Sequence, residues 1–320
     1  MVRAKVALSR LVGLGAGLLF AACGQAAPDQ PVETGGDQAP TADGGFSAHS
    51  YERNFVFATI EGDSVFLVSW LLGTVATPDT VTREATGWLA RGGIWEAFYA
   101  ERWGTPPTRA PARLLPYGSL RFVVREGDAV DGIIFAEGPR SLELVLGDVR
   151  ATWVGPRGEA FELLDGAAYL SDQRVEGVVM DMARASGDSA SPGGDWAFLL
   201  SGDSAYFVLA ADSEHVGDAE PLYRGWANLE ESDLQWPEVH VDWRETQAFP
   251  PARRDIPVAW RVWSSDGLIE GDLEAVSSDI RAGRGPGPLL PVRALFEVIG
   301  DISTVEGNFE VHGLLVHERR

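Results

Sequence analysis

The stretch IEGDSVFLV (Ile60–Val68) returns later in the chain as LSGDSAYFV (Leu200–Val208), and both copies place Gly-Asp-Ser between two apolar runs. The two stretches begin 140 residues apart. Glycine supplies the positive φ that a tight hairpin turn requires, and the flanking β-branched and aromatic residues are typical of strands. Each stretch is therefore predicted to be a β-hairpin, and its recurrence indicates a duplicated domain.

Seven further matches follow the first in the same order, at offsets between 135 and 141 residues. They pair Gly87-Trp88 with Gly225-Trp226, Trp103 with Trp243, Pro111 with Pro251, Pro116 with Pro257, Val130 with Ile269, Ala160 with Leu295 and Val175 with Val311. One such match recurs by accident, whereas eight in one order do not. We interpret the body as an internal duplication, with copies at 50–186 and 193–320.

Within each copy the apolar segments are short and aromatic or β-branched, as in LRFVV and WAFLL, and they end at Gly, Asp or Pro. This pattern predicts an all-β fold with about eight strands per copy. Eight antiparallel strands can close into an up-and-down barrel, which removes exposed edges and can enclose one small ligand. We expect two tandem eight-stranded barrels, with a β-sandwich of the same strand number as the alternative.

The composition supports a folded body and argues against nucleic acid as a partner. Of the 320 residues, 45% are hydrophobic, including 11 Trp and 14 Phe, which is enough for a substantial core. The formal net charge is −21 and no basic run occurs, so a nucleic-acid-binding surface is not expected.

The N-terminal segment is predicted to be an export signal. A basic segment, MVRAKVALSR, precedes the apolar run LVGLGAGLLFAA, which is too short to span a bilayer and fits a secretory signal. FAAC, ending at the sole cysteine, Cys23, resembles a bacterial lipobox, which implies a signal peptide over 1–22 and acylation of Cys23. The alternative is an ordinary signal peptide with an incidental cysteine. A single cysteine excludes a disulfide within the chain.

Residues 23–49 are rich in Gly, Pro, Ala, Asp and Gln and contain almost no large apolar residue, so they are predicted to form a flexible tether. The expected protein is lipid-anchored in the cell envelope. Gly24 follows the cysteine, and this favours the outer membrane, with the body facing the periplasm.

Three C-terminal segments carry a family resemblance. They are IPVAWRVWSSDGLIEGDLEAV (Ile256–Val276), RALFEVIG (Arg293–Gly300) and GNFEVHGLL (Gly307–Leu315). Together they resemble the C-terminal lipocalin-like domain of the carotenoid 1,2-hydratase (hydroxyneurosporene synthase) family, with Pro257, Trp260, Gly300, Glu310 and Gly313 at its motif positions. The resemblance implies two lipocalin-like domains in tandem. PVRALFEV departs from the family's Tyr-Trp-Glu-Gly, and Phe309 is displaced, so the fold is implied more strongly than the chemistry.

EVHVDW contains the candidate catalytic residues. On a strand, Glu238, His240 and Asp242 share one face and the intervening residues share the other. If the polar face lines a cavity, burial would raise a carboxyl pKa and Asp242 or Glu238, with His240 as proton partner, would serve as a general acid. The alternative is that all three face water. No second histidine lies nearby in sequence, so no metal site is expected.

The candidate ligand-binding residues are Trp243, Trp260, Glu310 and His312. Glu310 and His312 share a face of the last strand, and the alternative for Glu310 is a structural contact with Trp260 or Arg261. Gly-Asp-Ser lacks the surroundings of a nucleophilic serine and is expected to be a turn.

The function expected from the sequence is binding of a hydrophobic small molecule at the cell envelope, without a cofactor. Two alternatives stay open. The first is a hydratase or cyclase that acts on an isoprenoid-like substrate by general acid catalysis. The second is a structural or protein-binding envelope lipoprotein.

Overall fold

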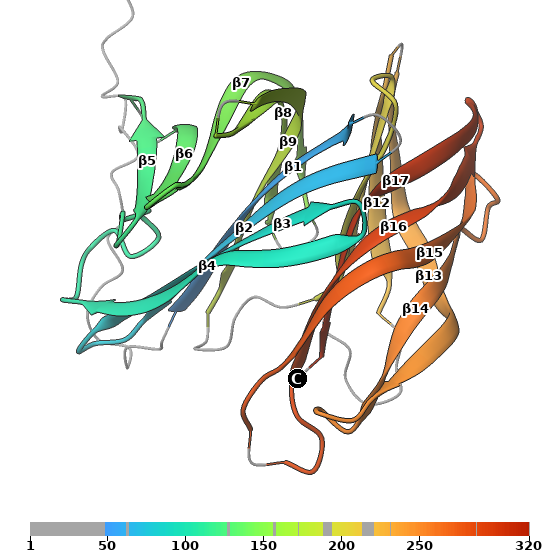
Figure 1. The fold of residues 1–320 in the computed structure, drawn as a ribbon. Helices are drawn as coiled ribbons and strands as arrows, with labels where there is room; N and C mark the ends of the chain where they lie inside the picture. Colours follow the sequence, from blue (N-terminus) through green and yellow to red (C-terminus); the bar gives the residue numbers. More distant parts are fainter. Residues whose placement is uncertain are drawn as a thin grey trace, which may run out of the picture. The chain divides into compact units, whose positions relative to one another are not determined.

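The structure, a computed structural model, describes residues 49–61, 64–126, 129–155, 158–171, 173–187, 194–212, 221–230, 232–285 and 287–319. The expected signal peptide, Cys23 and the tether up to residue 48 lie outside these residues. In the part of the chain that is described, every regular element is a β-strand, and no helix there is long and apolar enough to cross a membrane. The all-β prediction is confirmed (Figure 1).

Nine strands form the first sheet. They are β1 (His49–Glu61), β2 (Ser64–Ala76), β3 (Val81–Arg91), β4 (Ile94–Thr105), β5 (Leu120–Val124), β6 (Val130–Glu137), β7 (Arg140–Val154), β8 (Ala160–Leu170) and β9 (Gln173–Ser186). All neighbours are antiparallel, and β1 pairs with β9. The sheet order is β4-β3-β2-β1-β9-β8-β7-β6-β5, so the sheet curls but stays open between β4 and β5.

Eight strands form a closed barrel in the second half. They are β10 (Trp196–Ser201), β11 (Ala205–Ala211), β12 (Tyr223–Leu229), β13 (Asp233–Phe249), β14 (Arg254–Trp263), β15 (Ile269–Ala282), β16 (Val292–Thr304) and β17 (Gly307–Arg319). Pairing of β10 with β17 closes the ring. The tandem lipocalin-like architecture is thus confirmed, with one barrel closed and the other half open.

The difference between the halves has a local cause. In the barrel, β13 and β14 pair directly, with Phe249 opposite Arg254 across a tight turn. In the first sheet, the corresponding strands are separated by the long connection 106–119, which contains four prolines. Because proline has no backbone N–H to donate, this connection cannot extend a ladder from β4 to β5. The expected first barrel therefore does not close.

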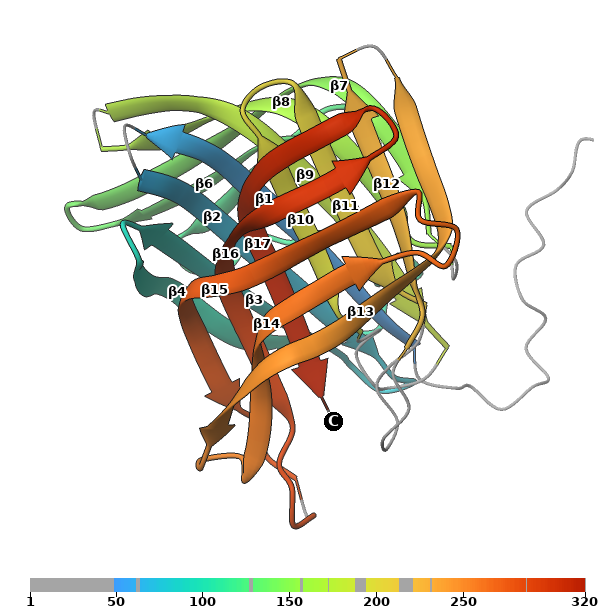
Figure 2. The same ribbon diagram turned by 90° about the vertical axis from the view of Figure 1, so that its right-hand side faces the viewer.

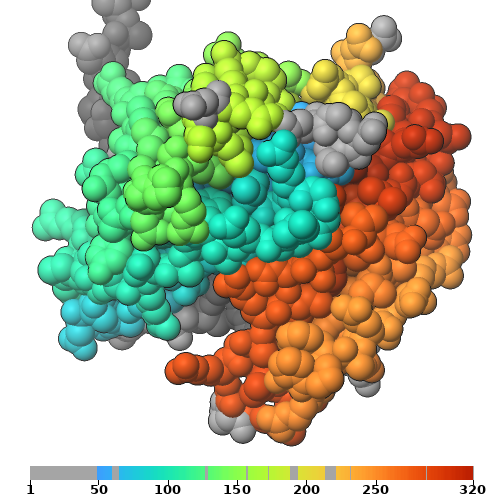
Figure 3. Space-filling view, viewed as in Figure 1, coloured from blue at the N-terminus to red at the C-terminus, as the bar shows by residue number. Residues whose placement is uncertain are grey.

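The two sheets lie face to face (Figure 2), and the two halves abut in the space-filling view (Figure 3). A shared apolar layer packs between the sheets. It includes Val56, Met180 and Phe161 from the first sheet and Phe198 and Trp226 from the barrel. A separate core fills the barrel interior, and a third lies on the concave side of the first sheet. Alternate residues of β10 and β11 enter the barrel core and the shared layer, which explains why WAFLL and AYFVLAA are almost wholly apolar.

Glycines allow the last strand of each half to approach the first strand closely. A Cβ at Gly313 of β17 would collide with the carbonyl oxygen of Phe198 in β10, and one at Gly177 of β9 would collide with the carbonyl oxygen of Ala58 in β1. These two glycines are the pair expected from the duplication to correspond. The full superposition of the two copies, and the domain limits 50–186 and 193–320, stay predictions.

Candidate functional site

A cleft of about 620 Å³ opens at one end of the layer between the sheets. Strands β1, β7, β8 and β9 line it from the first sheet, and β10, β11 and β17 line it from the barrel. Its wall combines apolar side chains such as Val178 and Leu200 with the polar residues Arg150, Tyr206 and His312. Charged residues also line it, among them Asp165, Arg174, Glu176 and Asp203, so the cleft combines apolar and charged surface.

Arg150 connects the two sides of the cleft. Its Nη1 donates a hydrogen bond to the phenol oxygen of Tyr206 at 2.6 Å, and its Nε donates to Oδ1 of Asp165 at 2.6 Å. The Tyr206 hydroxyl in turn donates to the carbonyl oxygen of Asp203 at 3.0 Å. Burial raises the pKa of Tyr206, although the Arg150 cation partly opposes this shift. The pair therefore presents a fixed cation and a neutral phenol.

His312 is a second buried titratable group of the cleft. It lies on β17 with 7% of its surface exposed, and within the described residues its Nε2 makes no hydrogen bond. Burial lowers the pKa of His312 to about 4, so its imidazole is neutral at neutral pH. A buried polar atom without a partner is costly, and such atoms are concentrated at functional sites.

His312 also borders a second hollow, of about 860 Å³, on the outer side of the barrel. Gly202 lines both hollows as well, so they adjoin at the turn between β10 and β11. The polar side chains Glu310, Asp301 and Arg244 line the second hollow. The two hollows thus meet at His312.

Two of the predicted ligand-binding residues, Glu310 and His312, do share a face of β17, because Val311 between them packs in the barrel core. Trp260 also borders the second hollow, but its ring is buried and packs edge-on against Phe296, with centroids 5.2 Å apart. Whether these side chains hold a ligand stays a prediction. Glu310 does not pair with Arg261 in the described structure, because Arg261 binds Glu270 at 2.5 Å instead.

The polar face of EVHVDW does not line the barrel interior. Val239 and Val241 belong to the barrel core, so Glu238, His240 and Asp242 point outwards.

On that outer surface, the Trp263 indole donates to Asp242 at 2.9 Å, and the His240 ring stacks on Trp263 at 4.2 Å. His240 Nε2 lies 3.3 Å from Oε1 of Glu238, a carboxylate that is mostly exposed. The proposed acid chemistry required a desolvated cavity, and the geometry places these groups at the surface instead. Trp243, on the opposite face, packs against the barrel core and meets His317 edge-on, with centroids 5.3 Å apart.

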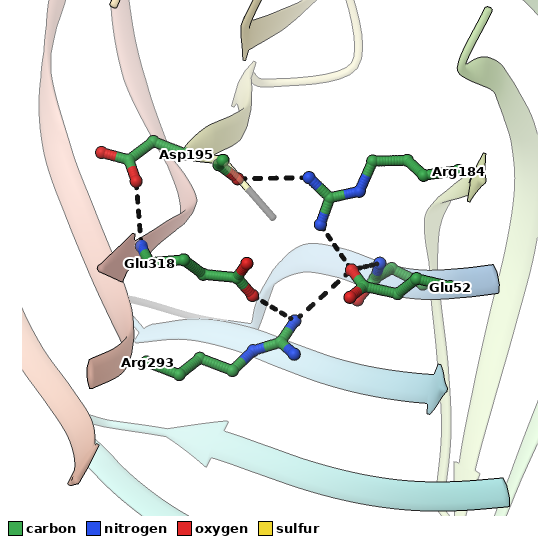
Figure 4. A network of polar contacts seen from close by, with 7 residues as sticks. Glu52, Arg184, Asp195, Arg293 and Glu318 are labelled. Carbon is green, nitrogen blue, oxygen red and sulfur yellow. Dashed lines mark hydrogen bonds and ion pairs between the residues drawn. The ribbon is translucent and has the colours of Figure 1, made fainter. Parts of the chain in front are cut away.

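A buried ionic network, not foreseen from the sequence, crosses the sheets away from the cleft (Figure 4). Arg184 donates to Glu52 at 2.5 Å, and Arg293 lies 3.7 Å from Glu52 and 3.2 Å from Glu318. The backbone N–H of Glu318 donates to Asp195 at 2.9 Å. Burial would raise the pKa of Glu52, but Arg184 and Arg293 outweigh it and hold that pKa far below its usual range. The network joins β1 and β9 to β16 and β17.

Sequence reasoning also missed Arg150 and Tyr206. Tyr206 is an isolated hydroxyl within an apolar run, and Arg150 is one of 26 basic residues, so neither stands out in a local pattern. Their relation is visible only once β7 and β11 face each other. Within the described ranges, no cluster of three or more His, Cys, Asp or Glu side chains could hold a metal ion.

Comparisons with known proteins support the fold. No protein-family model and no curated protein matches the chain. Among solved structures, kievitone hydratase from Nectria haematococca aligns over 84% of this chain and 87% of its own, with 10% identity and a TM-score of 0.52. A Nitrosomonas europaea protein provisionally named AttH aligns over 84% of this chain and 92% of its own, with 12% identity and a TM-score of 0.58.

A third structure, CghA with Sch210972, aligns over 83% of this chain and 87% of its own, with 12% identity. Its TM-score of 0.38 is too low to support an argument. The first two alignments extend through most of both chains, so the tandem lipocalin-like fold implied by the C-terminal resemblance is confirmed. The likeness to a hydratase is one of fold.

Proposed function

We propose that this protein binds a small molecule with an apolar body and an oxygen-bearing group in the cleft between the sheets. The apolar body would lie against Val178 and Leu200, and the oxygen would approach the Arg150 guanidinium. The observation that carries the proposal is the pairing of a cation and a phenol, Arg150 and Tyr206, on the wall of the cleft beside the apolar layer. A charged fork of this kind orients a carbonyl, phenolate or carboxylate oxygen.

A second candidate function is addition of water to the bound molecule, or its elimination. His312 favours it, because its buried imidazole is neutral at neutral pH and its Nε2, which is unpartnered in the described structure, has a lone pair that can accept a hydrogen bond from a water molecule in the cleft. For an enone, His312 would take a proton from water as the hydroxyl adds to the β-carbon. The electron pair would move to the carbonyl oxygen, stabilised by Arg150, and the proton would return to the α-carbon. The shared fold with kievitone hydratase agrees with this reaction type.

The experiment uses β-ionone, an isoprenoid enone, with the body of the protein. Binding is measured by calorimetry and hydration by loss of the enone absorbance. Arg150→Gln is expected to weaken binding at least tenfold, whereas His312→Gln should keep binding and abolish turnover. His240→Gln is the matched control, because His240 lies on the outer face of the barrel.

Each outcome separates the candidates. If the wild type binds β-ionone but does not hydrate it, the protein is a carrier and the hydratase proposal is contradicted. Binding that is unchanged in Arg150→Gln would contradict the cleft as the site. No binding of β-ionone, and no small molecule detected by mass spectrometry of the purified protein, would favour a structural or protein-binding role.

The sequence further supports export and lipid anchoring through Cys23, with the body at the periplasmic face of the outer membrane. Labelled palmitate should be incorporated into the wild type and not into Cys23→Ala. Persistent membrane association of that variant would contradict the anchor. A lipid-anchored carrier or enzyme would meet apolar molecules at the membrane surface, which agrees with the apolar layer beside the cleft.

A further inference from the structure

The outer side of the barrel carries a row of carboxylates at the second hollow. Asp272 of β15, Asp301 of β16 and Glu310 of β17 lie directly opposite one another across these neighbouring strands. All three are exposed, and they line the hollow of about 860 Å³. Their side chains share the outer face, because Leu273 and Val311, which alternate with them, pack in the barrel core. The row therefore concentrates negative charge on one wall of the hollow.

The nearby arginines compensate this charge only in part. Residues directly opposite on neighbouring strands lie about 5 Å apart, and like charges in such positions repel each other. Arg244 reaches Oδ1 of Asp272 with its Nε at 4.0 Å, and Arg261 binds Glu270 at 2.5 Å. Asp301 and Glu310 make no ion pair and no side-chain hydrogen bond within the described residues. With Glu274, four carboxylates line the hollow, and Arg244 is the one cation among the described residues of its wall.

His312 is an independent indication of a ligand in this hollow. Its imidazole lines the same wall and is 7% exposed, and its Nε2 has no hydrogen-bond partner in the part of the chain that is described. Burial lowers the pKa of His312 to about 4, so the ring is neutral at neutral pH and does not repel a cation. A neutral imidazole has one ring nitrogen that accepts a hydrogen bond. An ammonium group would supply the missing donor.

The hollow also offers apolar surface between its charged groups. Ile299 of β16 lies between Glu274 and His312 on the neighbouring strands, and 44% of its surface is exposed. Ala259 lines the hollow as well. Within the described ranges, no three acidic or histidine side chains converge closely enough to hold a metal ion. The matching ligand is therefore a cation whose charges are spread along an alkyl chain.

We propose that this hollow binds a linear aliphatic polyamine. Its ammonium groups would form charge-assisted hydrogen bonds with the carboxylates of Asp272, Asp301 and Glu310. These carboxylates recur at the strand spacing of about 4.8 Å, and short methylene spacers separate the nitrogens of such an amine by a similar distance. The methylenes would lie against Ile299, and one ammonium group would donate to His312. The site does not rest on the proposed function, although His312 borders both hollows.

The test uses spermidine, a linear triamine, with the full chain. Binding is measured by calorimetry at low ionic strength, because salt screens interactions between exposed charges. Butylamine and hexaamminecobalt(III) are the comparison ligands. Spermidine should bind at least tenfold more tightly than butylamine, which has a single charge. It should also bind at least tenfold more tightly than hexaamminecobalt(III), which carries the charge of spermidine on one compact ion.

Two pairs of variants separate this site from a general effect of charge. Glu310→Gln should weaken spermidine binding at least fivefold, whereas Glu306→Gln removes the same charge from an exposed residue outside the hollow and should leave the affinity within twofold. Ile299→Lys places a cation in the hollow at an exposed position and should abolish binding. Val305→Lys is its matched control, because Val305 is exposed and does not line the hollow.

Two further measurements make the outcome decisive. In nitrogen NMR spectra, the ring signals of His312 should shift on addition of spermidine and those of His240 should not. Arg150→Gln should bind spermidine as the wild type does, whether or not β-ionone binds in the cleft, so failure of one proposal is distinguishable from failure of the other. Hexaamminecobalt(III) binding as tight as spermidine binding, equal losses in Glu310→Gln and Glu306→Gln, or spermidine affinity unchanged in Ile299→Lys, would each overturn the proposal.

Discussion

Arg150 of β7 donates a hydrogen bond from Nη1 to the phenol oxygen of Tyr206 of β11, with 2.6 Å between the two atoms. This contact joins the first sheet to the barrel at the cleft. Both partners also bind residues of their own half, since Arg150 contacts Asp165 and Tyr206 contacts Asp203. The contact therefore links the two halves through two side chains whose positions are fixed by hydrogen bonds within each half.

Tyr206→Phe is expected to lower the free energy of unfolding by about 1 kcal/mol, because it removes the acceptor of this hydrogen bond and retains the ring. Urea titration measures the change. Tyr169→Phe serves as the control, since the Tyr169 ring lies near Arg174, at 5.6 Å, but its hydroxyl makes no hydrogen bond within the described residues. Equal losses in the two variants would show that the Arg150 contact contributes nothing.

His312 should make stability depend on pH in mildly acidic solution. Burial lowers the pKa of His312 from 6.5 to about 4. Between these values the unfolded chain binds a proton at this residue and the folded chain does not. The free energy of unfolding therefore falls as the pH is lowered through this range, by up to about 1.4 kcal/mol per pH unit, and recovers as the pH rises.

The measurement compares urea unfolding of the wild type and His312→Gln at pH 4.5, 5.5 and 7. The difference between the two proteins isolates this residue from other titrating groups, such as Glu318, whose pKa burial raises. We expect the wild type to lose more stability than the variant on acidification. Parallel profiles would mean that His312 is as well solvated as in the unfolded chain.

Removal of one arginine from the buried network should lower the free energy of unfolding much more than removal of an arginine from a surface ion pair. Arg184→Met removes the 2.5 Å ion pair of the buried Glu52 carboxylate and leaves the more distant Arg293 and the Asn54 amide beside it, so the expected loss is about 3–5 kcal/mol. Arg174→Met is the control on the same strand, because the Arg174–Glu176 pair is exposed and is expected to contribute about 0–1 kcal/mol. A loss below 1 kcal/mol in both variants would contradict a stabilising role for the network.

Gly313→Ala is expected to destabilise the protein by about 3 kcal/mol or more, because the new Cβ would collide with the Phe198 carbonyl where β17 pairs with β10. Thermal unfolding followed by circular dichroism measures the loss. Gly187→Ala is the control, since nothing lies within 4 Å of the position that its new Cβ would take. A Gly313→Ala protein as stable as this control would mean that the seam between β10 and β17 adjusts freely.

Asp242→Asn tests the outer polar face of β13. The amide keeps an oxygen that can accept from the Trp263 indole, so stability should change by no more than about 0.5 kcal/mol. Binding and turnover of β-ionone should be unchanged, because Asp242 lies outside the cleft. A loss of turnover with normal stability would instead restore EVHVDW as the catalytic element.

Local pattern was sufficient for much of the fold. The Gly-Asp-Ser hairpin at Ser201–Ser204 joins β10 to β11 as expected, and the glycine has a φ of 56°. Period-two alternation also placed Val239 and Val241 on one face of a strand and His240 on the other. It did not show which face of β13 is the inside of the barrel, because both faces of a strand satisfy the same alternation.

The sequence by itself determined the strand character and the internal repeat, because hairpin turns and alternation are local properties of the chain, and its C-terminal resemblance implied the tandem lipocalin-like fold. Only the tertiary structure decided that the first sheet stays open between β4 and β5 and that Arg150 meets Tyr206. It also decided that His312 is buried, while His240 faces outwards. These features depend on which surfaces of the two halves pack together, and that packing joins residues more than 50 positions apart, whose relation no local spacing encodes.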